Sequence, residues 1–197
     1  MAKLAADAIA NALHHEETEA DALTDSVTGL PNARALRLRF EQEAGQARGA
    51  AQSFAVLMMD LDYFKKVNDT LGHTAGNDAL RQVADLLSRH IRSNDFVGRY
   101  AGDEYVALLP NIGPLEVREL VGRLQQAVDN RRFGVDDSSA LIGISIGWAC
   151  YGADGESIDE LLLAADRAMY ADKLRRKSLA SISEEVVQQA PGDYRVM

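Results

Sequence analysis

The chain has 197 residues, of which 47% are hydrophobic and 26% are charged, and its formal net charge is −9. This composition predicts one globular domain with extensions. The acidic balance argues against a general nucleic-acid-binding protein, because no large basic surface is available to neutralise phosphates. The single cysteine, Cys150, excludes an intrachain disulfide. No apolar stretch is long enough to span a bilayer, so we expect a cytoplasmic chain without a membrane segment.

Residues 1–24 are predicted to form a helical leader or signalling stalk. From Ala5 to Leu23 the chain is rich in alanine, glutamate and leucine and contains neither proline nor glycine, which favours a helix. Its apolar seam is thin and is interrupted by Glu16 and Glu17, so self-association through this helix alone should be weak.

The next stretch predicts a boundary followed by a second helix. Gly29 and Pro31 end the leader, and Asn32 is a good N-cap for a helix from Ala33 to about Ala44. Residues Gln46 to Gln52 are small and polar and are predicted to form a loop.

Two strand-like segments carry acidic residues at their ends. The run Phe54–Asp62 (FAVLMMDLD) is apolar enough to be buried on both faces, and Asp60 lies near its end. Phe96–Pro110 has the pattern of a β-hairpin with Asp103 and Glu104 in its turn. Alone, these acids would be ordinary turn residues. If the two segments pair, the carboxylates converge at one sheet edge and repel unless they share a hard cation such as Mg²⁺.

A short helix is predicted to start at Tyr63–Lys66, directly after the acidic strand. Its unpaired N–H groups would face the acids and offer a place for phosphate oxygens, with Lys65 or Lys66 assisting.

The polar stretch that follows has two interpretations. In the first, Gly72 and Gly76 turn the backbone twice and aim polar side chains into a cleft. In the second, the stretch is a polar helix–loop–helix and Asn77 caps a helix from Ala79 to Arg92. The residues alone leave both open. The polar residues concerned are Asn68, Asp69, His73, Asn77 and Asp78.

Four motifs in order resemble those of GGDEF-domain diguanylate cyclases. They are Asp25–Asn32 (DSVTGLPN), Asp60–Asn77 (DLDYFKKVNDTLGHTAGN), Arg99–Tyr105 (RYAGDEY) and Ala165–Lys173 (ADRAMYADK). The resemblance covers roughly Asp25 to Lys177. It implies an enzyme that joins two GTP molecules into cyclic di-GMP and releases pyrophosphate, with one GTP held by each subunit of a homodimer.

The resemblance also implies the fold, which is α+β with a palm-like, mainly antiparallel central sheet surrounded by helices. The rest of the chain agrees with it, because Pro114–Val128 reads as an amphipathic helix, Ala140–Ala149 as a buried strand and Ile158–Lys177 as a helix. We expect a catalytic domain at 25–178 and a partly disordered tail at 179–197.

The catalytic and binding residues follow from the resemblance, position by position. Two Mg²⁺ or Mn²⁺ ions per site would activate the 3′-hydroxyl and neutralise the triphosphate. Asp103 and Glu104 would be catalytic, with Asp103 as the base or metal ligand beside that hydroxyl. A monomer should be nearly inactive, because the attack needs the GTP of a facing subunit. The implied metal ligands are Asp60, the Leu61 carbonyl, Asp103 and Glu104. The implied nucleotide contacts are the backbone around Phe64 and Lys65, the side chains of Lys173, Lys177, Asn68, His73 and Asn77, and Gly102.

Three departures from the family pattern concern the turn and the last helix. Ala101 replaces the first glycine, which costs about 1 kcal/mol if that position needs a positive φ and nothing otherwise. Tyr105 replaces phenylalanine and adds a hydroxyl at a packing position. Arg176 and Lys177 replace a Gly-Arg pair, which keeps the charge but loses the planar guanidinium.

The fourth departure is Asn77, which stands where the family has a guanine-reading aspartate. A carboxylate accepts from both guanine N1–H and N2–H₂, whereas an amide offers one acceptor and one donor, and the donor suits adenine N1. We therefore predict relaxed selection toward ATP, with some cyclic GMP-AMP formed. The alternative is that Asn68 and the Asn77 carbonyl still suffice for guanine.

Regulation and an alternative function are also predicted. Arg92 to Asp95 (RSND) resembles the family's RxxD product-inhibition site, where arginine grips phosphate or guanine and aspartate takes the donors of guanine. Cyclic di-GMP bound there would lock the subunits apart. The alternative function is a catalytically weak or inactive domain that serves as a cyclic di-GMP receptor. Ala101 and Asn77 favour this alternative, and the retained acids favour the cyclase.

Overall fold

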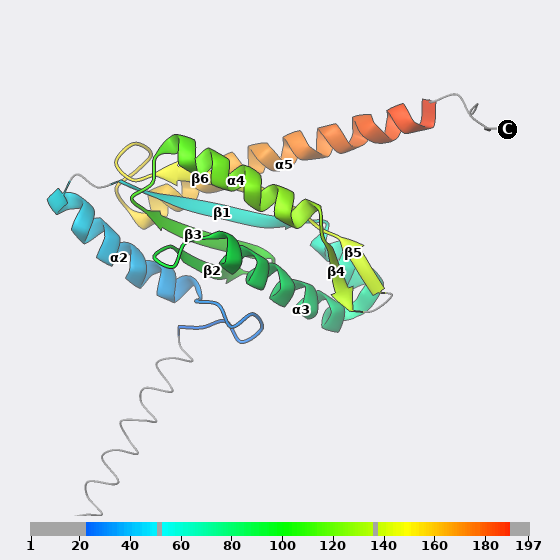
Figure 1. The fold of residues 1–197 in the computed structure, drawn as a ribbon, viewed down its shortest axis with the longest axis horizontal. Coiled ribbons are helices and arrows are strands. Elements are labelled where there is room, and N and C mark those ends of the chain that lie inside the picture. The colour runs from blue at the N-terminus through cyan, green and yellow to red at the C-terminus, as the bar shows by residue number, and fades with distance from the viewer. Residues whose placement is uncertain (1–22, 51–52, 136–137, 190–197) are drawn as a thin grey trace, which may run out of the picture.

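The structure is a computed structural model that describes residues 23–50, 53–135 and 138–189 (Figure 1). The predicted leader helix lies outside these ranges, apart from its last residue, Leu23.

A four-stranded antiparallel sheet forms the centre of the molecule, in the order β2-β3-β1-β6. The strand β1 pairs with a neighbour on each side, and its apolar run is buried on both faces of the sheet, as the sequence predicts. A separate two-stranded sheet pairs β4 with β5. The predicted strand from Ala140 is therefore divided between β5 and β6. The strands are β1 (Phe54–Asp62), β2 (Phe96–Ala101), β3 (Glu104–Pro110), β4 (Arg132–Val135), β5 (Ser138–Leu141) and β6 (Gly143–Cys150).

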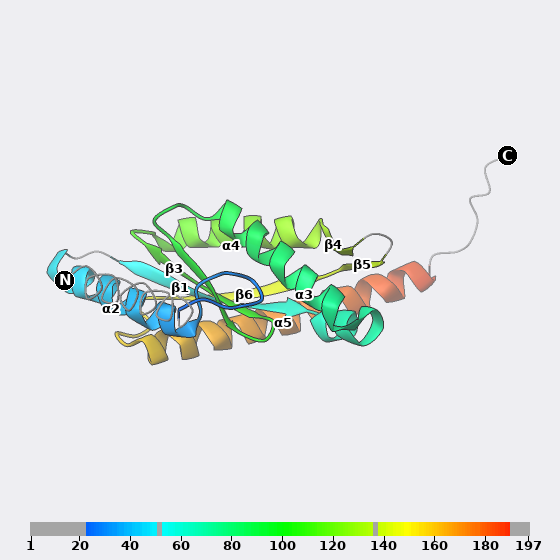
Figure 2. The same cartoon turned by 90° about the horizontal axis from the view of Figure 1, so that it is seen from below.

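Helices cover both faces of the central sheet (Figure 2). On one face lie α3 (Phe64–His90) and α4 (Pro114–Asp129), and on the other lie α2 (Ala33–Ala50) and α5 (Ile158–Gln189). The side chains of β1 alternate between the two cores, because successive residues of a strand point to opposite faces. Leu57 and Met59 pack toward α3 and α4, while Val56 and Met58 pack toward α2 and α5. The palm-like α+β fold expected from the resemblance is confirmed.

The helix α3 runs through both glycines of its polar stretch, and only one of them bends it. Gly72 leaves the helical region with φ 82° and ψ 164°. Gly76 is buried inside the helix, so the prediction of a second turn there is wrong. Its lack of a side chain has another use, because a Cβ at Gly76 would lie 1.9 Å from Oδ1 of Asn68. Asn77 likewise lies within the helix and does not cap it.

Two other helices are longer than predicted. Asn32 caps α2, as expected, and its Oδ1 accepts hydrogen bonds from the backbone N–H of Arg34 and of Ala35 at 2.9 and 3.2 Å. The helix then continues to Ala50, through the stretch predicted as a loop. Apart from Gly49, the residues there favour a helix intrinsically, and Ala47 is buried against the sheet. At the other end of the chain, α5 continues past Lys177 to Gln189. No helix in the described part of the chain combines the length and apolarity needed to cross a membrane.

Tyr105, which replaces the phenylalanine of the family, is fully buried, and its hydroxyl donates to the Leu80 carbonyl of α3 at 2.9 Å. Burial raises the pKa of this phenol far above its usual value, so the hydroxyl stays protonated and can donate. We expect Tyr105→Phe to lower the free energy of unfolding by about 1 kcal/mol, the net value of one such hydrogen bond. Urea denaturation would measure it, and Tyr105→Ala, which loses the whole ring, should cost about 3–5 kcal/mol. A phenylalanine variant at least as stable as the native chain would contradict this role.

Candidate functional site

The pairing of β1 with β3 brings the acidic ends of the two segments together. Asp60 lies opposite Glu104 in the antiparallel register. The backbone N–H of Leu61 donates to the carbonyl of Asp103 at 3.2 Å, which ties the hairpin turn to the end of β1. The side chains of Asp103 and Glu104 are half-buried at this edge. We call Asp60, Asp103 and Glu104 the acidic edge.

The acidic edge concentrates negative charge. Burial raises the pKa of Asp103, and the charge of Asp60 adds to this effect, against the opposing influence of its own backbone N–H and of Lys173. Burial also raises the pKa of Glu104, and the charges of Asp60, Asp103 and Asp166 act in the same direction. Carboxylates that make one another harder to ionise attract a cation.

In this structure, that cation is the ammonium group of Lys173 on α5. Its Nζ lies 2.5 Å from Oδ1 of Asp60, and both side chains are largely buried. Burial alone would lower the pKa of Lys173, but the hydrogen bond to Asp60 and the charges of Asp60, Asp62 and Asp103 outweigh it and raise this pKa. Sequence reasoning placed Lys173 on the phosphates and missed its contact with the acidic edge.

The acidic edge fits a divalent cation by its chemistry, although it is not gathered around a single point. Its oxygen donors are those that Mg²⁺ prefers, and the raised pKa values of Asp103 and Glu104 reflect burial first and the charges of neighbouring carboxylates second. Within residues 23–50, 53–135 and 138–189, no three His, Cys, Asp or Glu side chains lie close enough to hold a metal ion. The predicted repulsion is instead reduced by Lys173, so ion binding would require these side chains to rearrange.

The hairpin turn is held by Arg99, a residue to which the sequence analysis gave no role. Its Nε and Nη2 donate to the Gly102 carbonyl at 2.8 and 2.7 Å, and its Nη1 donates to both carboxylate oxygens of Asp25. Gly102 has φ 51°, in the left-handed region that favours glycine. Ala101 has no positive φ, so the loss of the first glycine of the motif carries no backbone strain. The only indication of these contacts in the sequence was that Asp25 and Arg99 are each the first residue of a motif that resembles the family's.

A pocket of about 370 Å³ opens beside the turn, between it and α3. It brings together seven predicted nucleotide or catalytic residues with two that were not predicted. Its polar side chains comprise two amides, three basic groups and one carboxylate, that of Asp103. We call it the turn pocket. Its lining residues are Phe64, Lys65, Asn68, His73, Asn77, Leu80, Arg99, Gly102 and Asp103.

The start of α3 lies at the edge of the turn pocket and is suited to anions. No side chain caps this helix terminus. The residue before it, Tyr63, adopts a left-handed conformation with φ 64° and ψ 13°. Uncapped N–H groups together with the helix dipole favour negative charge. The nearby Lys65 adds a positive charge, so phosphate groups would fit here.

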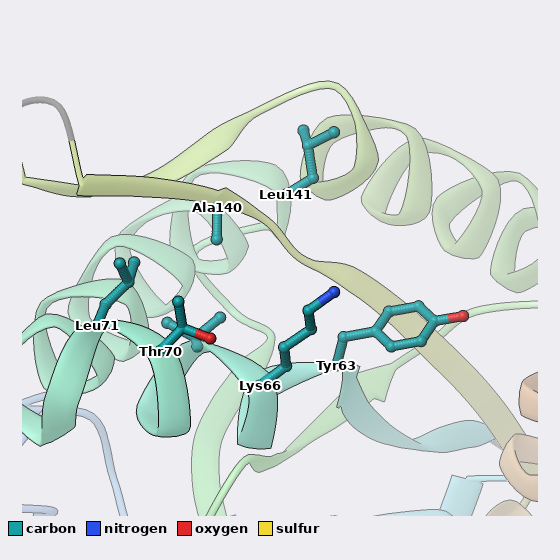
Figure 3. A pocket seen from close by; sticks show the side chains of 7 residues that line it. Tyr63, Lys66, Thr70, Leu71, Ala140 and Leu141 are labelled. Atoms are coloured by element: carbon teal, nitrogen blue, oxygen red, sulfur yellow. The ribbon is translucent and has the colours of Figure 1, made fainter.

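The side chains of the neighbouring Lys65 and Lys66 line two different hollows. Lys65 lines the turn pocket, whereas Lys66 lines a hollow of about 230 Å³ between α3 and β5, which Figure 3 shows. In that view, Lys66 extends from α3 toward the strand that carries Ala140 and Leu141. Apart from Lys66, which was one of the two lysines expected to assist in phosphate binding, the hollow is lined by none of the predicted site residues. The other predicted phosphate contact, Lys177, is exposed on α5 and does not line the turn pocket.

The RxxD motif lies on another side of the domain, between α3 and β2. The carboxylate of Asp95 accepts from the backbone N–H of Arg92 at 2.8 Å, and the Arg92 side chain lies 3.8 Å from Glu116 of α4. Burial raises the pKa of Asp95, partly offset by that hydrogen bond and by the charges of Arg92 and Arg39. Both motif residues line a pocket of about 510 Å³ that also includes Arg39, and we call it the Arg92 pocket.

The fold and this geometry define a palm-like α+β domain with an acidic edge beside a polar, phosphate-compatible pocket. The sequence profile of the family described as "Diguanylate cyclase, GGDEF domain" matches residues 22–178. The chain therefore belongs to the GGDEF-domain family.

Curated relatives and solved structures agree with this assignment. The chain is 36% identical to the diguanylate cyclase DgcP of Pseudomonas aeruginosa over 169 residues, which are 85% of this chain and 25% of that protein. It is 31% identical to the response regulator PleD of Caulobacter vibrioides over 154 residues, 77% of this chain and 34% of PleD. The chain thus spans a quarter to a third of these proteins' lengths.

Among solved structures, a coiled-coil and GGDEF fragment of DgcB from Caulobacter crescentus in complex with c-di-GMP gives a TM-score of 0.81 at 27% identity. This comparison covers 87% of this chain and 91% of that one. A sensory box/GGDEF family protein from Caulobacter crescentus gives 0.73 at 32% identity and covers 78% and 99%.

Proposed function

We propose that the chain is a cyclic dinucleotide synthase that condenses two GTP molecules into cyclic di-GMP and releases pyrophosphate. The observation that carries this proposal is the position of the acidic edge, with Asp103 belonging both to it and to the turn pocket. Family membership and the names of the diguanylate cyclase relatives support the same activity.

The chain's own residues supply most of the binding. The turn pocket would take the nucleoside between Asn68, His73 and Asn77, which line it. The uncapped start of α3 and Lys65 would take the triphosphate. Lys173 would move from Asp60 toward the phosphates when they arrive, because a triphosphate competes for the same ammonium group.

The acidic edge would hold Mg²⁺ or Mn²⁺ through Asp60, Asp103, Glu104 and the Leu61 carbonyl. When bound, such ions activate the hydroxyl and neutralise the triphosphate charge. Asp103 would accept a hydrogen bond from the attacking 3′-hydroxyl at the end of the turn pocket, and Arg99 would keep that turn in place.

The reaction needs two copies of the chain. The 3′-oxygen of one GTP attacks the α-phosphorus of the other, a new P–O bond forms, and the bond to the leaving pyrophosphate breaks. Repeating the step in the opposite direction closes the ring. One turn pocket holds one nucleotide, so the second must come from a facing subunit. Turnover per chain should therefore rise with protein concentration until the dimer is saturated.

The test is a product assay by mass spectrometry with GTP and Mg²⁺ at high protein concentration, with Glu104→Gln as the blank. A cyclic dinucleotide that is absent from the blank supports the proposal. No product from a demonstrated dimer would favour the alternative function, a cyclic di-GMP receptor that uses the Arg92 pocket.

The Arg92 pocket is the proposed site of product feedback, and the complex of DgcB with c-di-GMP supports binding of this ligand within the family. We expect Arg92→Ala to weaken cyclic di-GMP binding about tenfold to a hundredfold, because it removes charge-assisted hydrogen bonds to phosphate or guanine. Isothermal titration calorimetry with the product would measure it. The matched control is Arg89→Ala, which replaces an exposed arginine in the last turn of α3, three residues before Arg92. Equal affinity of native chain and Arg92→Ala would refute the assignment.

Base selection is the remaining part of the proposal. Asn77 lines the turn pocket, and its amide can accept only one of the two donors on guanine. We infer that the enzyme admits ATP to a measurable extent and forms some cyclic GMP-AMP.

A further inference from the structure

Two ion pairs link the end of β1 to α5, and only one of them involves a residue of the proposed catalytic machinery. Lys173 binds Asp60, and three residues further along the helix Arg176 binds Asp62, with Nε 3.0 Å from Oδ2. The pairs are parallel because residues two apart on a strand and three apart on a helix each share a face.

Arg176 is held on two sides. Its Nη2 lies 2.7 Å from the carboxylate of Asp129, at the end of α4, while its Nε serves Asp62. Asp62 is one of the few buried charged residues in the described part of the chain, and its other oxygen accepts from the Ser145 hydroxyl at 2.8 Å. Arg176 is therefore the cationic partner of a buried carboxylate.

Lys173 lies within the electrostatic reach of both carboxylates. Asp60 and Asp62 are two residues apart on β1 and share a face of the strand, and Lys173 forms its ion pair with Asp60 while Arg176 takes Asp62. A buried carboxylate left without its cation is strongly unfavourable and attracts the nearest positive group. If Arg176 were absent, that group would be Lys173, and Asp60 would lose its partner.

We propose that Arg176 is a positioning residue, which neutralises Asp62 and thereby keeps Lys173 on Asp60. The effect on catalysis rests on the proposed function, since Lys173 is placed there as a phosphate contact. The part of the inference that concerns the ion pair between Lys173 and Asp60 holds whether or not the proposed function is correct.

The first test measures the partner of Lys173 without any nucleotide. A double-mutant cycle with Lys173→Met and Asp60→Asn, read by urea denaturation, gives the coupling between these side chains. We expect a clear coupling in the native chain and the loss of most of it when Arg176→Ala is added to every member. In the Arg176→Ala background, a cycle of Lys173→Met with Asp62→Asn should gain a coupling. An unchanged Lys173–Asp60 coupling would overturn the proposal.

The second test uses rescue to separate positioning from general loosening. We expect Arg176→Ala to lower kcat/KM for GTP about tenfold, because small misplacements of a binding group are costly. Adding Asp62→Asn removes the competing carboxylate and should restore kcat/KM to within about twofold of the native chain. Arg176→Lys should restore it in part, since an ammonium group can replace one of the two contacts. Arg167→Ala, an exposed position on α5, controls for substitution of an arginine on the helix surface.

The outcomes separate this inference from the proposed function. A native chain that makes no cyclic dinucleotide rejects the function, while the folding cycles still test where Lys173 binds. If Arg176→Ala lowers kcat/KM and the added Asp62→Asn does not restore it, the loss comes from loosening of α5. That result would overturn the proposal that Asp60 and Asp62 compete for Lys173.

Discussion

Replacing Glu104 by glutamine is expected to reduce cyclic dinucleotide formation by about a hundredfold or more while leaving the fold intact. Glutamine keeps the size of the side chain but removes one negative charge from the acidic edge, where the transition-state charge would be stabilised. Removing one such group from an enzyme site costs on the order of 10²–10³ in rate. Glu104 lies opposite Asp60, so this charge is central to the acidic edge.

The same substitution is expected not to lower the thermal stability of the folded chain. Burial and the charges of Asp60 and Asp103 raise the pKa of Glu104, which means that the folded state disfavours its ionised form. The unfavourable contribution is present above the folded-state pKa and absent below the unfolded one. At neutral pH, Glu104→Gln should therefore unfold at the same temperature as the native chain or a higher one.

Two measurements check this prediction together. Mass spectrometry gives the product formed per chain, and thermal unfolding without nucleotide gives the stability. Glu41→Gln, an exposed glutamate on α2, is the matched control and should change neither. A variant that retains more than a tenth of native turnover would remove Glu104 from the machinery. A sharp loss of stability would show that its role is structural.

The central strands were predictable because their patterns are local. Nine consecutive, mostly apolar residues in β1 indicate a strand buried on both faces, and that is its position in the sheet. Gly102 and Asp103, between β2 and β3, similarly mark a hairpin turn. Once these two elements are known, the meeting of Asp60 with Glu104 follows from antiparallel pairing.

Element boundaries were harder to predict, because the residues around them suit more than one structure. The apolar run around Ile142 looks continuous, and nothing in its composition shows that the chain leaves one sheet there and enters another. In one of the two interpretations of the polar stretch, Gly76 turns the backbone, because glycine is common in turns. Its actual role, close contact with Asn68, depends on how the two parts of α3 pack against each other across the bend at Gly72.

The missed parts of the site are contacts between residues far apart in the sequence. Lys173 and Asp60 are separated by 113 positions, and Arg99 and Asp25 by 74. Both contacts depend on which helix or loop lies over which strand end, which periodicity does not determine. The resemblance identified the motifs but gave no reason for Asp25 and Arg99 to meet.

Changing Asn77 to aspartate is expected to raise the preference for GTP over ATP by about tenfold to a hundredfold. An aspartate accepts from both N1–H and N2–H₂ of guanine, and such a bidentate pair is worth about 1–3 kcal/mol of discrimination. The measurement is the base composition of the product pool at equal GTP and ATP concentrations. The native chain should give cyclic di-GMP with some cyclic GMP-AMP, and Asn77→Asp should give almost only cyclic di-GMP.

The carboxylate of Asp78, next in the chain, does not replace the aspartate that the family has at position 77. Asp78 lies 2.6 Å from Arg81 in an ion pair on α3, and it is absent from the lining of the turn pocket. Asn130→Asp makes the same chemical change at the exposed end of α4 and should leave the product ratio unaltered. If the native chain forms only cyclic di-GMP from equal nucleotides, then Asn68 and the Asn77 carbonyl suffice for guanine. In that case, Asn77→Asp would change affinity for GTP but not the identity of the product.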